Sequence, residues 1–282
     1  MNGSTGQIAF QGEEGAYSHQ ACREVYPELT PLPCKTFEAA LDAVRTREAD
    51  LAMMPIENST YGRVADLHHL LPEAGLYIIG EHFVPVRINL YGVPGAKLED
   101  VRSAQSHTVL LGQVRKFLAQ HEIDAVVGAD TAGSAKEIAA AADPSRGALA
   151  SPLAGELNDL VTLAEGIQDN AHNTTRFLVL SRQRIEEEPG SGNAMTSFVF
   201  QVRNVPAALY KAMGGFATNK VNMLKLESYM TDGSFTATQF YAEIEGHPED
   251  EGVAYAMEEL GFFTSYLKVL GVYPRAPFRK GR

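Results

Sequence analysis

The chain has 282 residues, of which 45% are hydrophobic, and it contains two cysteines. This length fits about two domains, and the lack of an apolar run of about 18 residues argues against a membrane span. The net charge of −11 lies in the first 194 residues, because residues 195–282 carry nine basic and nine acidic side chains. Such an acidic surface argues against nucleic-acid and anionic-membrane partners.

Short apolar strands alternate with helical segments through the first 180 residues. We expect strands at 8–10, 50–54, 76–93, 101–104, 125–128, 149–150, 161–164 and 177–180, and helices at 16–26, 37–47, 64–71, 108–121 and 132–142. Alternation of this kind is typical of an α/β fold with mostly parallel strands, whose sites lie beyond the carboxyl ends of strands. The strand order predicts two lobes, with the chain crossing near 80–93 and returning near 165–170.

A polar, Gly/Pro-punctuated linker at 183–194 separates this region from a different pattern. Beyond it we expect strands at 197–202, 222–229, 235–244 and 263–273, and helices at 206–217 and 249–260. This order is a βαββαβ unit, a ferredoxin-like arrangement.

Cys22 and Cys34 lack the spacing of a metal site, and the N-terminal residues lack the basic and apolar segments of a signal peptide. We therefore expect reduced thiols and a cytoplasmic protein.

Two hydroxyls and a cation, Thr174, Thr175 and Arg176, lead into the apolar strand at 177–180. Polar groups at the mouth of a buried strand are costly unless they have partners, and a fixed hydroxyl beside a fixed cation suits an oxygen-rich anion. An ordinary turn followed by a surface arginine explains the same residues equally well.

A second polar cluster follows the strand at 50–54. Glu57, Asn58 and Ser59 lie where that strand is expected to end. An amide both donates and accepts hydrogen bonds, which suits a ligand that bears a hydroxyl and a carboxylate. A cap before a helix near Gly62 is the alternative, and it fits Ser59 better than the pair Glu57 and Asn58.

Two weaker motifs also follow strands. Gly12 and Gly15 allow close backbone approach at a helix start, although a simple strand–helix turn explains them as well. Ser106 is expected to cap the helix at 108–121, with Gln113 two turns further along the same helix. The four motifs can converge on one cleft, and none supplies a nucleophile–base pair, a metal cluster or a Walker loop.

Taken together, the motifs resemble the prephenate dehydratase family over nearly the whole chain. The resemblance rests on Gly-Glu-Glu-Gly-Ala-Tyr-Ser at 12–18, Pro-Ile-Glu-Asn-Ser at 55–59, Ser-His at 106–107 with Gln113, and Asn-Thr-Thr-Arg-Phe at 173–177. It implies a two-lobed α/β catalytic region resembling periplasmic binding proteins, followed by an ACT regulatory domain. The implied domains are a catalytic domain at 1–182, with lobes of about 1–82 plus 166–182 and 83–165, and an ACT domain at 195–282.

The implied reaction is the decarboxylating dehydration of prephenate to phenylpyruvate in phenylalanine biosynthesis, without a metal or other cofactor. Thr175 matches the family's catalytic hydroxyl. The implied substrate-binding residues are Glu57, Asn58, Ser59, Ser106, Gln113, Thr174, Arg176 and Phe177. For Arg176, an ion pair with an acidic residue is the alternative to binding a substrate carboxylate.

The C-terminal region implies allosteric control by phenylalanine. The positions implied for its binding are Asn204, Pro206, Ala207, Ala208, Leu209, Asn222, Glu227 and Ser228. Ala207 stands where relatives usually have glycine, and Tyr229 with Met230 replaces the Arg-Pro that follows Glu-Ser in relatives. We also expect a homodimer or homotetramer. A domain that serves only to dimerise the protein is the alternative to phenylalanine control.

Two other functions remain open. Arogenate dehydratase carries out the same elimination on the amino-acid analogue of prephenate, and the sequence does not separate these substrates. A non-catalytic solute-binding protein shares the two-lobed fold, but the lack of a signal peptide and the ACT-like region argue against it.

Overall fold

The computed structural model describes residues 6–185, 187–203, 205–230 and 237–281. The chain forms two compact units, Met1–Val64 with Phe83–Phe177, and Ala65–His82 with Leu178–Arg282. Because this division groups residues 65–82 with the C-terminal region, the domain boundaries expected from the sequence stay a prediction. Within the described residues, no helix is long and apolar enough to cross a bilayer.

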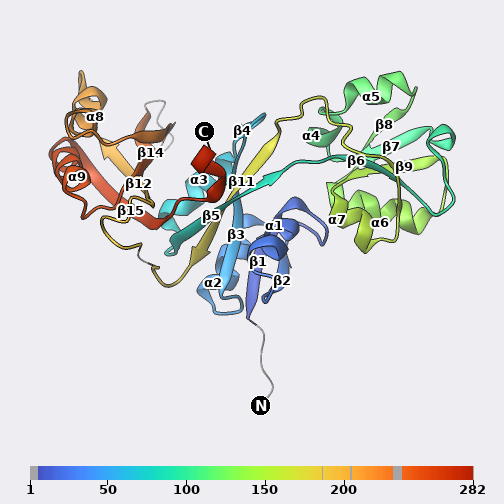
Figure 1. Cartoon of the computed structure of the whole chain (residues 1–282), viewed down its shortest axis with the longest axis horizontal. Coiled ribbons are helices and arrows are strands. Elements are labelled where there is room, and N and C mark those ends of the chain that lie inside the picture. Colours follow the sequence, from blue (N-terminus) through green and yellow to red (C-terminus); the bar gives the residue numbers. More distant parts are fainter. Residues whose placement is uncertain (1–5, 186, 204, 231–236, 282) are drawn as a thin grey trace, which may run out of the picture. The chain divides into compact units, whose positions relative to one another are not determined.

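The first sheet contains the strands that carry Asn58 and Thr175 (Figure 1). In the order in which they pair, its strands are β2 (Thr30–Cys34), β1 (Gln7–Gln11), β3 (Leu51–Asn58), β11 (Thr174–Ser181) and β5 (Tyr77–Pro85), with β4 (Gly62–Arg63) beside β3. β1 runs parallel to β2 and to β3, whereas β4 folds back antiparallel on β3. The chain returns to the first sheet at β11, which lies between β3 and β5 and carries Thr175.

The second sheet is mixed. Its strands pair in the order β10 (Val161–Ala164), β6 (Asn89–Gly92), β9 (Arg146–Ala150), β7 (Ser103–Ser106) and β8 (Asp124–Val127). β7 is parallel to β8 and β9, but β6 is antiparallel to β9 and β10. The extended segment expected at 76–93 is two strands, and it crosses from the first sheet to the second.

Helices cover these two sheets. They are α1 (Tyr17–Val25), α2 (Phe37–Arg45), α4 (Thr108–Leu111), α5 (Arg115–Gln120), α6 (Thr131–Ala141) and α7 (Pro152–Leu157). α2 is capped by Thr36, whose hydroxyl accepts from Ala39 N at 3.1 Å. Apolar residues of the second lobe, among them Leu90, Ala104 and Val114, form a buried cluster.

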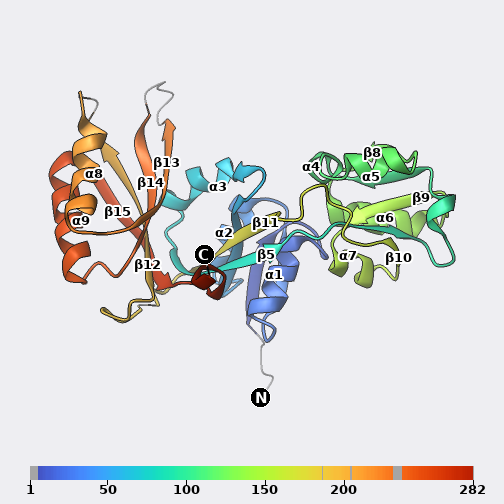
Figure 2. The ribbon, with the colours of Figure 1, turned by 45° about the horizontal axis from the view of Figure 1, so that its top comes forward.

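The C-terminal sheet is antiparallel and pairs in the order β13 (Met223–Met230), β14 (Ala237–Glu245), β12 (Ala194–Val202) and β15 (Thr264–Pro274). Its helices, α8 (Ala208–Thr218) and α9 (Glu251–Phe263), lie on one face (Figure 2). Phe198, Phe216 and Leu260 belong to the buried cluster between helices and sheet. The expected βαββαβ order is confirmed.

The compact unit that includes the C-terminal sheet also contains α3 (Ala65–Leu70) and the 3₁₀ turns η1 (Leu71–Glu73) and η3 (Pro277–Gly281). The 3₁₀ turn η2 (Leu98–Asp100) belongs to the unit that includes the N-terminal strands. α3 packs on the C-terminal sheet through aromatic contacts. The ring centroids of His68 and Tyr241 are 5.0 Å apart, and those of His69 and Tyr229 are 5.5 Å apart. Tyr229, which departs from the family pattern, is 4% exposed and therefore serves in this packing.

β2 and α7 are among the elements that were not expected from the sequence. β2 reads Thr-Pro-Leu-Pro-Cys, and its two prolines argue against a central strand. Because β2 lies at the edge of its sheet, the missing N–H groups are tolerated there. α7 is only six residues long, although Ser151 caps it and Pro152 occupies its first turn.

Candidate active site

The candidate site centres on a hydrogen bond between neighbouring strands. Asn58 Nδ2 on β3 donates to Thr175 Oγ1 on β11 at 3.0 Å. Both residues lie inside their strands, so the expectation that they follow or precede a strand was wrong. β3 extends to Asn58 because β4 pairs with its end, Asn58 opposite Gly62, and no helix begins at Gly62.

The orientation of the Asn58 amide is set by the backbone. Its Oδ1 accepts from Thr60 N at 2.9 Å and from Tyr61 N at 3.0 Å. Because the NH2 end of an amide cannot accept a hydrogen bond from a backbone N–H group, these contacts identify which end of the amide faces Thr175. The Asn58 nitrogen therefore occupies one acceptor site of the Thr175 oxygen and leaves the hydroxyl hydrogen available to another acceptor.

The side-chain amide of Asn173 connects Asn58 on the first lobe to Gln113 on the second. Asn58 Nδ2 also donates to Asn173 Oδ1 at 2.7 Å, and Asn173 Nδ2 donates to Gln113 Oε1. Asn173 is 3% exposed, and Gln113 is 8% exposed. The sequence reasoning included Asn173 in the motif at 173–177 but gave it no role. Its position directly before two hydroxyl residues was the only available signal.

Gln113 does not lie on a continuous helix, and this corrects the expected helix at 108–121. The segment breaks into α4 and α5 around Gly112 and Gln113. The Gln113 carbonyl accepts from Asp169 N at 2.6 Å, so it is used by the returning segment. The break, rather than helical spacing from Ser106, places the Gln113 side chain against Asn173.

Ser106 is fully buried at the end of β7, and its hydroxyl donates to Leu149 O at 2.8 Å. The expectation that it caps the next helix was wrong. His107 caps α4 instead, with Nδ1 accepting from Val109 N at 3.3 Å. β7 pairs with β9 as well as with β8, which keeps Ser106 extended and places its hydroxyl beside β9.

Ser59 and Thr174 hold the returning segment in place. Ser59 N donates to Thr174 O, and Thr174 N donates to Ser59 Oγ, both at 2.9 Å. The Ser59 hydroxyl in turn donates to His172 O at 2.9 Å. These contacts align β3 with β11, on which the bond between Asn58 and Thr175 depends.

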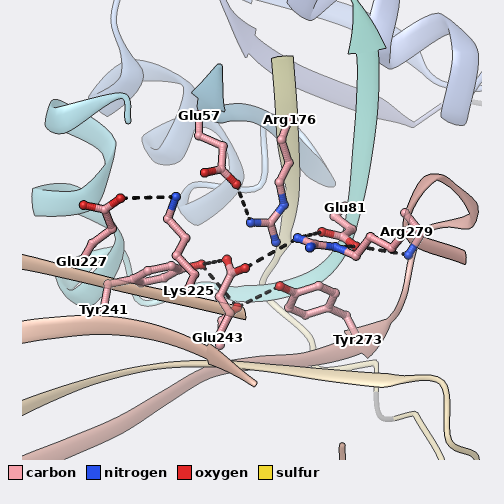
Figure 3. Close-up of polar contacts among 11 residues, drawn as sticks. Glu57, Glu81, Arg176, Lys225, Glu227, Tyr241, Glu243, Tyr273 and Arg279 are labelled. Carbon is pink, nitrogen blue, oxygen red and sulfur yellow. Dashed lines mark hydrogen bonds and ion pairs between the residues drawn. The ribbon is translucent and has the colours of Figure 1, made fainter. Parts of the chain in front are cut away.

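Glu57 and Arg176 form an ion pair on the opposite face of the same two strands. Arg176 Nη1 is 2.9 Å from Glu57 Oε1, and the two side chains are 2% and 28% exposed (Figure 3). Side chains alternate between faces along a strand, so Arg176 points away from the Thr175 side. The ion-pair alternative for Arg176 is supported, rather than direct contact with a substrate on the Thr175 side. Phe177 is 1% exposed and is a core residue.

The Gly12–Ser18 motif connects the lobes. Gly15 has a φ of +93°, and a Cβ there would lie 2.8 Å from Ala154 Cα. Its carbonyl accepts from Ser151 Oγ at 2.5 Å, and its N–H donates to His19 Nδ1 at 3.0 Å. Burial, with a further contribution from Arg23, lowers the pKa of His19 from its ordinary value.

The residues implied for phenylalanine binding lie on separate elements of the C-terminal sheet and its helix. Ala207 precedes α8 with a φ of +61°, a conformation that favours glycine. Asn222 Nδ2 donates to Glu245 Oε2 at 3.0 Å, and Lys225 Nζ is 3.5 Å from Glu227 Oε1. Of the other implied positions, Asn204 lies outside the residues that the structure describes. The structure does describe the remaining four, Pro206, Ala208, Leu209 and Ser228.

Among the side chains that the structure describes, no group of three or more His, Cys, Asp or Glu is arranged to hold a metal ion. Cys22 and Cys34 are free thiols, and burial raises the pKa of Cys22 to about 12.

Comparison with known proteins identifies the family. Residues 8–185 match the model described as prephenate dehydratase. The chain is 49% identical over 280 residues to a bifunctional N-acyl-homoserine lactone acylase/prephenate dehydratase of Komagataeibacter europaeus, covering 99% of each chain. It is 35% identical to arogenate dehydratase/prephenate dehydratase 1 of Arabidopsis thaliana, covering 95% of this chain and 72% of that protein.

The same fold is found in a solved relative. The crystal structure of prephenate dehydratase from Arthrobacter aurescens, in complex with L-Phe, matches with a TM-score of 0.87 and 33% identity, covering 96% of this chain and 90% of that one. The expected fold class, two α/β lobes with an antiparallel C-terminal sheet, is confirmed. The chain belongs to the prephenate dehydratase family, lyases that convert prephenate to phenylpyruvate.

Proposed function

We propose that Thr175 is the catalytic group of this chain's prephenate dehydratase reaction and that Asn58 positions it. Prephenate loses carbon dioxide as its ring carboxylate C–C bond breaks, the electron pair enters the ring, and the ring C–O bond breaks. The leaving oxygen needs a proton to depart as water. The single observation that carries the proposal is the 3.0 Å hydrogen bond from Asn58 to Thr175 Oγ1.

The amide makes the hydroxyl a better donor. Because Asn58 donates to the Thr175 oxygen, the hydroxyl hydrogen is directed to another acceptor, which we assign as the leaving oxygen. An N–H bond to that oxygen also stabilises the negative charge that develops as the hydrogen moves. Threonine is a weak acid, so fixed position and local electrostatics supply most of the rate, with hydrogen transfer adding about 10²–10⁴-fold.

The substrate carboxylates are assigned to neutral donors. Gln113, at the end of the amide chain through Asn173, places an amide nitrogen on the second lobe. We propose that this nitrogen binds a carboxylate, and that Ser59, Thr174 and Ser106 act by holding the strands around the site. Glu57 and Arg176 act from the opposite face by aligning β3 with β11.

The test replaces Thr175 with alanine and with serine and follows phenylpyruvate absorbance. Thr175→Ala is expected to lower kcat by about 10²–10⁴-fold, and Thr175→Ser to retain most of it, because the serine keeps the hydroxyl. Thr162→Ala, on an exposed position of β10, is the matched control. Near-full activity in Thr175→Ala contradicts the assignment.

Phenylalanine is the proposed effector. The Arthrobacter relative was solved with L-Phe, and the implied binding positions are retained in sequence at Glu227 and Ser228. β13, which carries both, is an edge strand, so we propose a homodimer or homotetramer in which this edge is covered by another subunit. Calorimetry that detects no phenylalanine binding at millimolar concentration contradicts this regulation, and sedimentation as a monomer contradicts the oligomer.

The substrate preference is proposed to be prephenate over arogenate. The family model that matches residues 8–185 is named for prephenate, and the plant relative is named for both substrates. Parallel kcat/KM measurements with the two compounds decide, and a higher value for arogenate reverses the preference.

A second activity is proposed from the Komagataeibacter relative, whose name includes N-acyl-homoserine lactone acylase and which is 49% identical over 99% of both chains. In this reaction water cleaves the amide bond and releases a fatty acid and homoserine lactone. Mass spectrometry of both products tests it, with a boiled-protein control. Retention of this activity in Thr175→Ala would assign the two reactions to different groups, and absence of product from the wild type refutes the proposal.

The cytoplasmic location stays part of the proposal, supported by the free thiols of Cys22 and Cys34. Cell fractionation with antibody detection tests it, and recovery of the protein in another compartment contradicts it.

A further inference from the structure

The C-terminal residues bind a buried carboxylate on β5. Glu81 Oε1 accepts from Ala276 N at 3.1 Å and from Arg279 Nε at 2.7 Å, while Oε2 accepts from Arg279 Nη2 at 3.0 Å. Figure 3 shows the Arg279 side chain directed at Glu81. The Glu81 side chain has no exposed surface, and the Arg279 side chain is 21% exposed. Two donors of one planar guanidinium fix both the position and the direction of a carboxylate.

Arg279 also reaches a second buried carboxylate. Its Nη2 lies 3.6 Å from Glu243 Oε2 on β14, where the Glu243 side chain is 1% exposed. Tyr241, on the same strand, donates its hydroxyl to Glu243 Oε1 at 2.5 Å. Arg279 therefore ties β5 to the C-terminal sheet within one unit, and its loss removes a cation from two desolvated carboxylates, which is costly.

Glu81 shares its strand with a residue that supports the ion pair behind the candidate site. Glu81 and Phe83 are two residues apart on β5, so their side chains leave the same face. The Phe83 ring centroid is 5.9 Å from Arg176 Cζ, a cation–π distance. Arg176 binds Glu57, and the residues next to this pair on β11 and β3 are Thr175 and Asn58.

We propose that Arg279 is a positioning residue for the dehydratase reaction. By holding Glu81 it fixes β5, and through Phe83 and Arg176 it keeps Thr175 aligned with Asn58. This inference rests on the proposed function of Thr175 and extends it to the last residues of the chain.

The experiment compares full-length Arg279→Gln and Arg279→Lys with Arg275→Gln. Arg275 lies on the same segment and pairs at 2.8 Å with Glu245, which is 30% exposed and lies on β14 rather than on β5. Because a small misalignment of catalytic groups is costly, Arg279→Gln is expected to lower kcat about 10-fold with KM changed less than about 3-fold. Arg279→Lys should fall between it and the wild type, because lysine keeps the charge and loses the fork, and Arg275→Gln should match the wild type.

Hydrogen–deuterium exchange gives a readout that needs no turnover. Backbone amides in peptides covering residues 77–85 should exchange faster in Arg279→Gln than in the wild type. Their exchange rate should be unchanged in Arg275→Gln. If Arg279→Gln does not fold, Glu81→Gln keeps the side-chain shape and serves in its place, with the same expected kcat loss. Unchanged exchange, an unchanged kcat, or an equal kcat loss in Arg275→Gln overturns the proposal. An inactive wild type refutes the proposed function instead, while the exchange data still decide whether Arg279 holds β5.

Discussion

Successive side chains of β3 and β11 point to opposite faces of this strand pair, and the two faces differ in chemistry. One face carries a neutral network, in which the amides of Asn58 and Asn173 connect Thr175 to Gln113. The other carries a buried ion pair between Glu57 and Arg176. Neutral donors can be reoriented by a ligand at small cost, whereas a desolvated ion pair resists separation. The comparison assigns reactivity to the first face and alignment to the second.

The largest expected effect tests the charged face. Arg176→Met leaves the Glu57 carboxylate without this cation and is expected to lower the free energy of unfolding by about 3 kcal/mol, since breaking a buried pair costs about 3–5 kcal/mol and Glu57 is partly hydrated. Urea unfolding measures it. Adding Glu57→Met should restore part of the loss, and a double variant less stable than the single one would show that the pair is not the cause.

The next effect tests the neutral face. Asn58→Ala should lower kcat about 10²-fold because Thr175 loses the donor to its oxygen, while stability falls by only about 1–2 kcal/mol. Asn158→Ala, which removes a similar amide that donates to Ala154 O at 2.8 Å, is the control for kcat. If Asn58→Ala loses stability as Arg176→Met does and keeps its kcat, the two faces have been assigned the wrong way round.

A smaller effect, on stability alone, is expected at Ala207, which lies outside the β3–β11 strand pair. Ala207 holds a φ of +61° before α8, and Ala207→Gly is expected to raise the free energy of unfolding by about 1 kcal/mol by removing that strain. The kcat should not change. A change in kcat in step with this added stability would mean that stability alone sets the rate, so that the faces cannot be separated by mutation.

The smallest effect concerns acid. None of the four side chains of the neutral face, Asn58, Asn173, Thr175 and Gln113, is titratable. We expect His19 to make the free energy of unfolding depend on pH in mild acid. Its pKa is lowered in the fold, so the unfolded chain binds more protons below the ordinary value near 6.5. Stability should therefore fall as pH decreases from about 6.5 through the folded pKa and then level off. Urea unfolding at several pH values should show a flatter dependence in His19→Gln, and an unchanged slope would exclude His19.

The sequence predicted elements well where local pattern decides, and less well where pairing decides. In the C-terminal sheet, alternation and turn residues were enough to obtain the βαββαβ order. The ends of β3 and β7 depend instead on partner strands, β4 for Asn58 and β8 for Ser106. The break at Gln113 depends on Asp169 N, 56 positions along the chain. The sequence named Asn58, Thr175 and Gln113, which the structure connects by hydrogen bonds through Asn173, but which face each residue occupies required the strand register.

The tie between Arg279 and Glu81 has a consequence for synthesis. The two residues are 198 positions apart along the chain. At roughly 5–20 residues per second, the ribosome reaches Arg279 about 10–40 s after Glu81. β5 is therefore synthesised well before the guanidinium that holds its buried carboxylate, so the position of Glu81 is fixed only once the growing chain has been extended to Arg279.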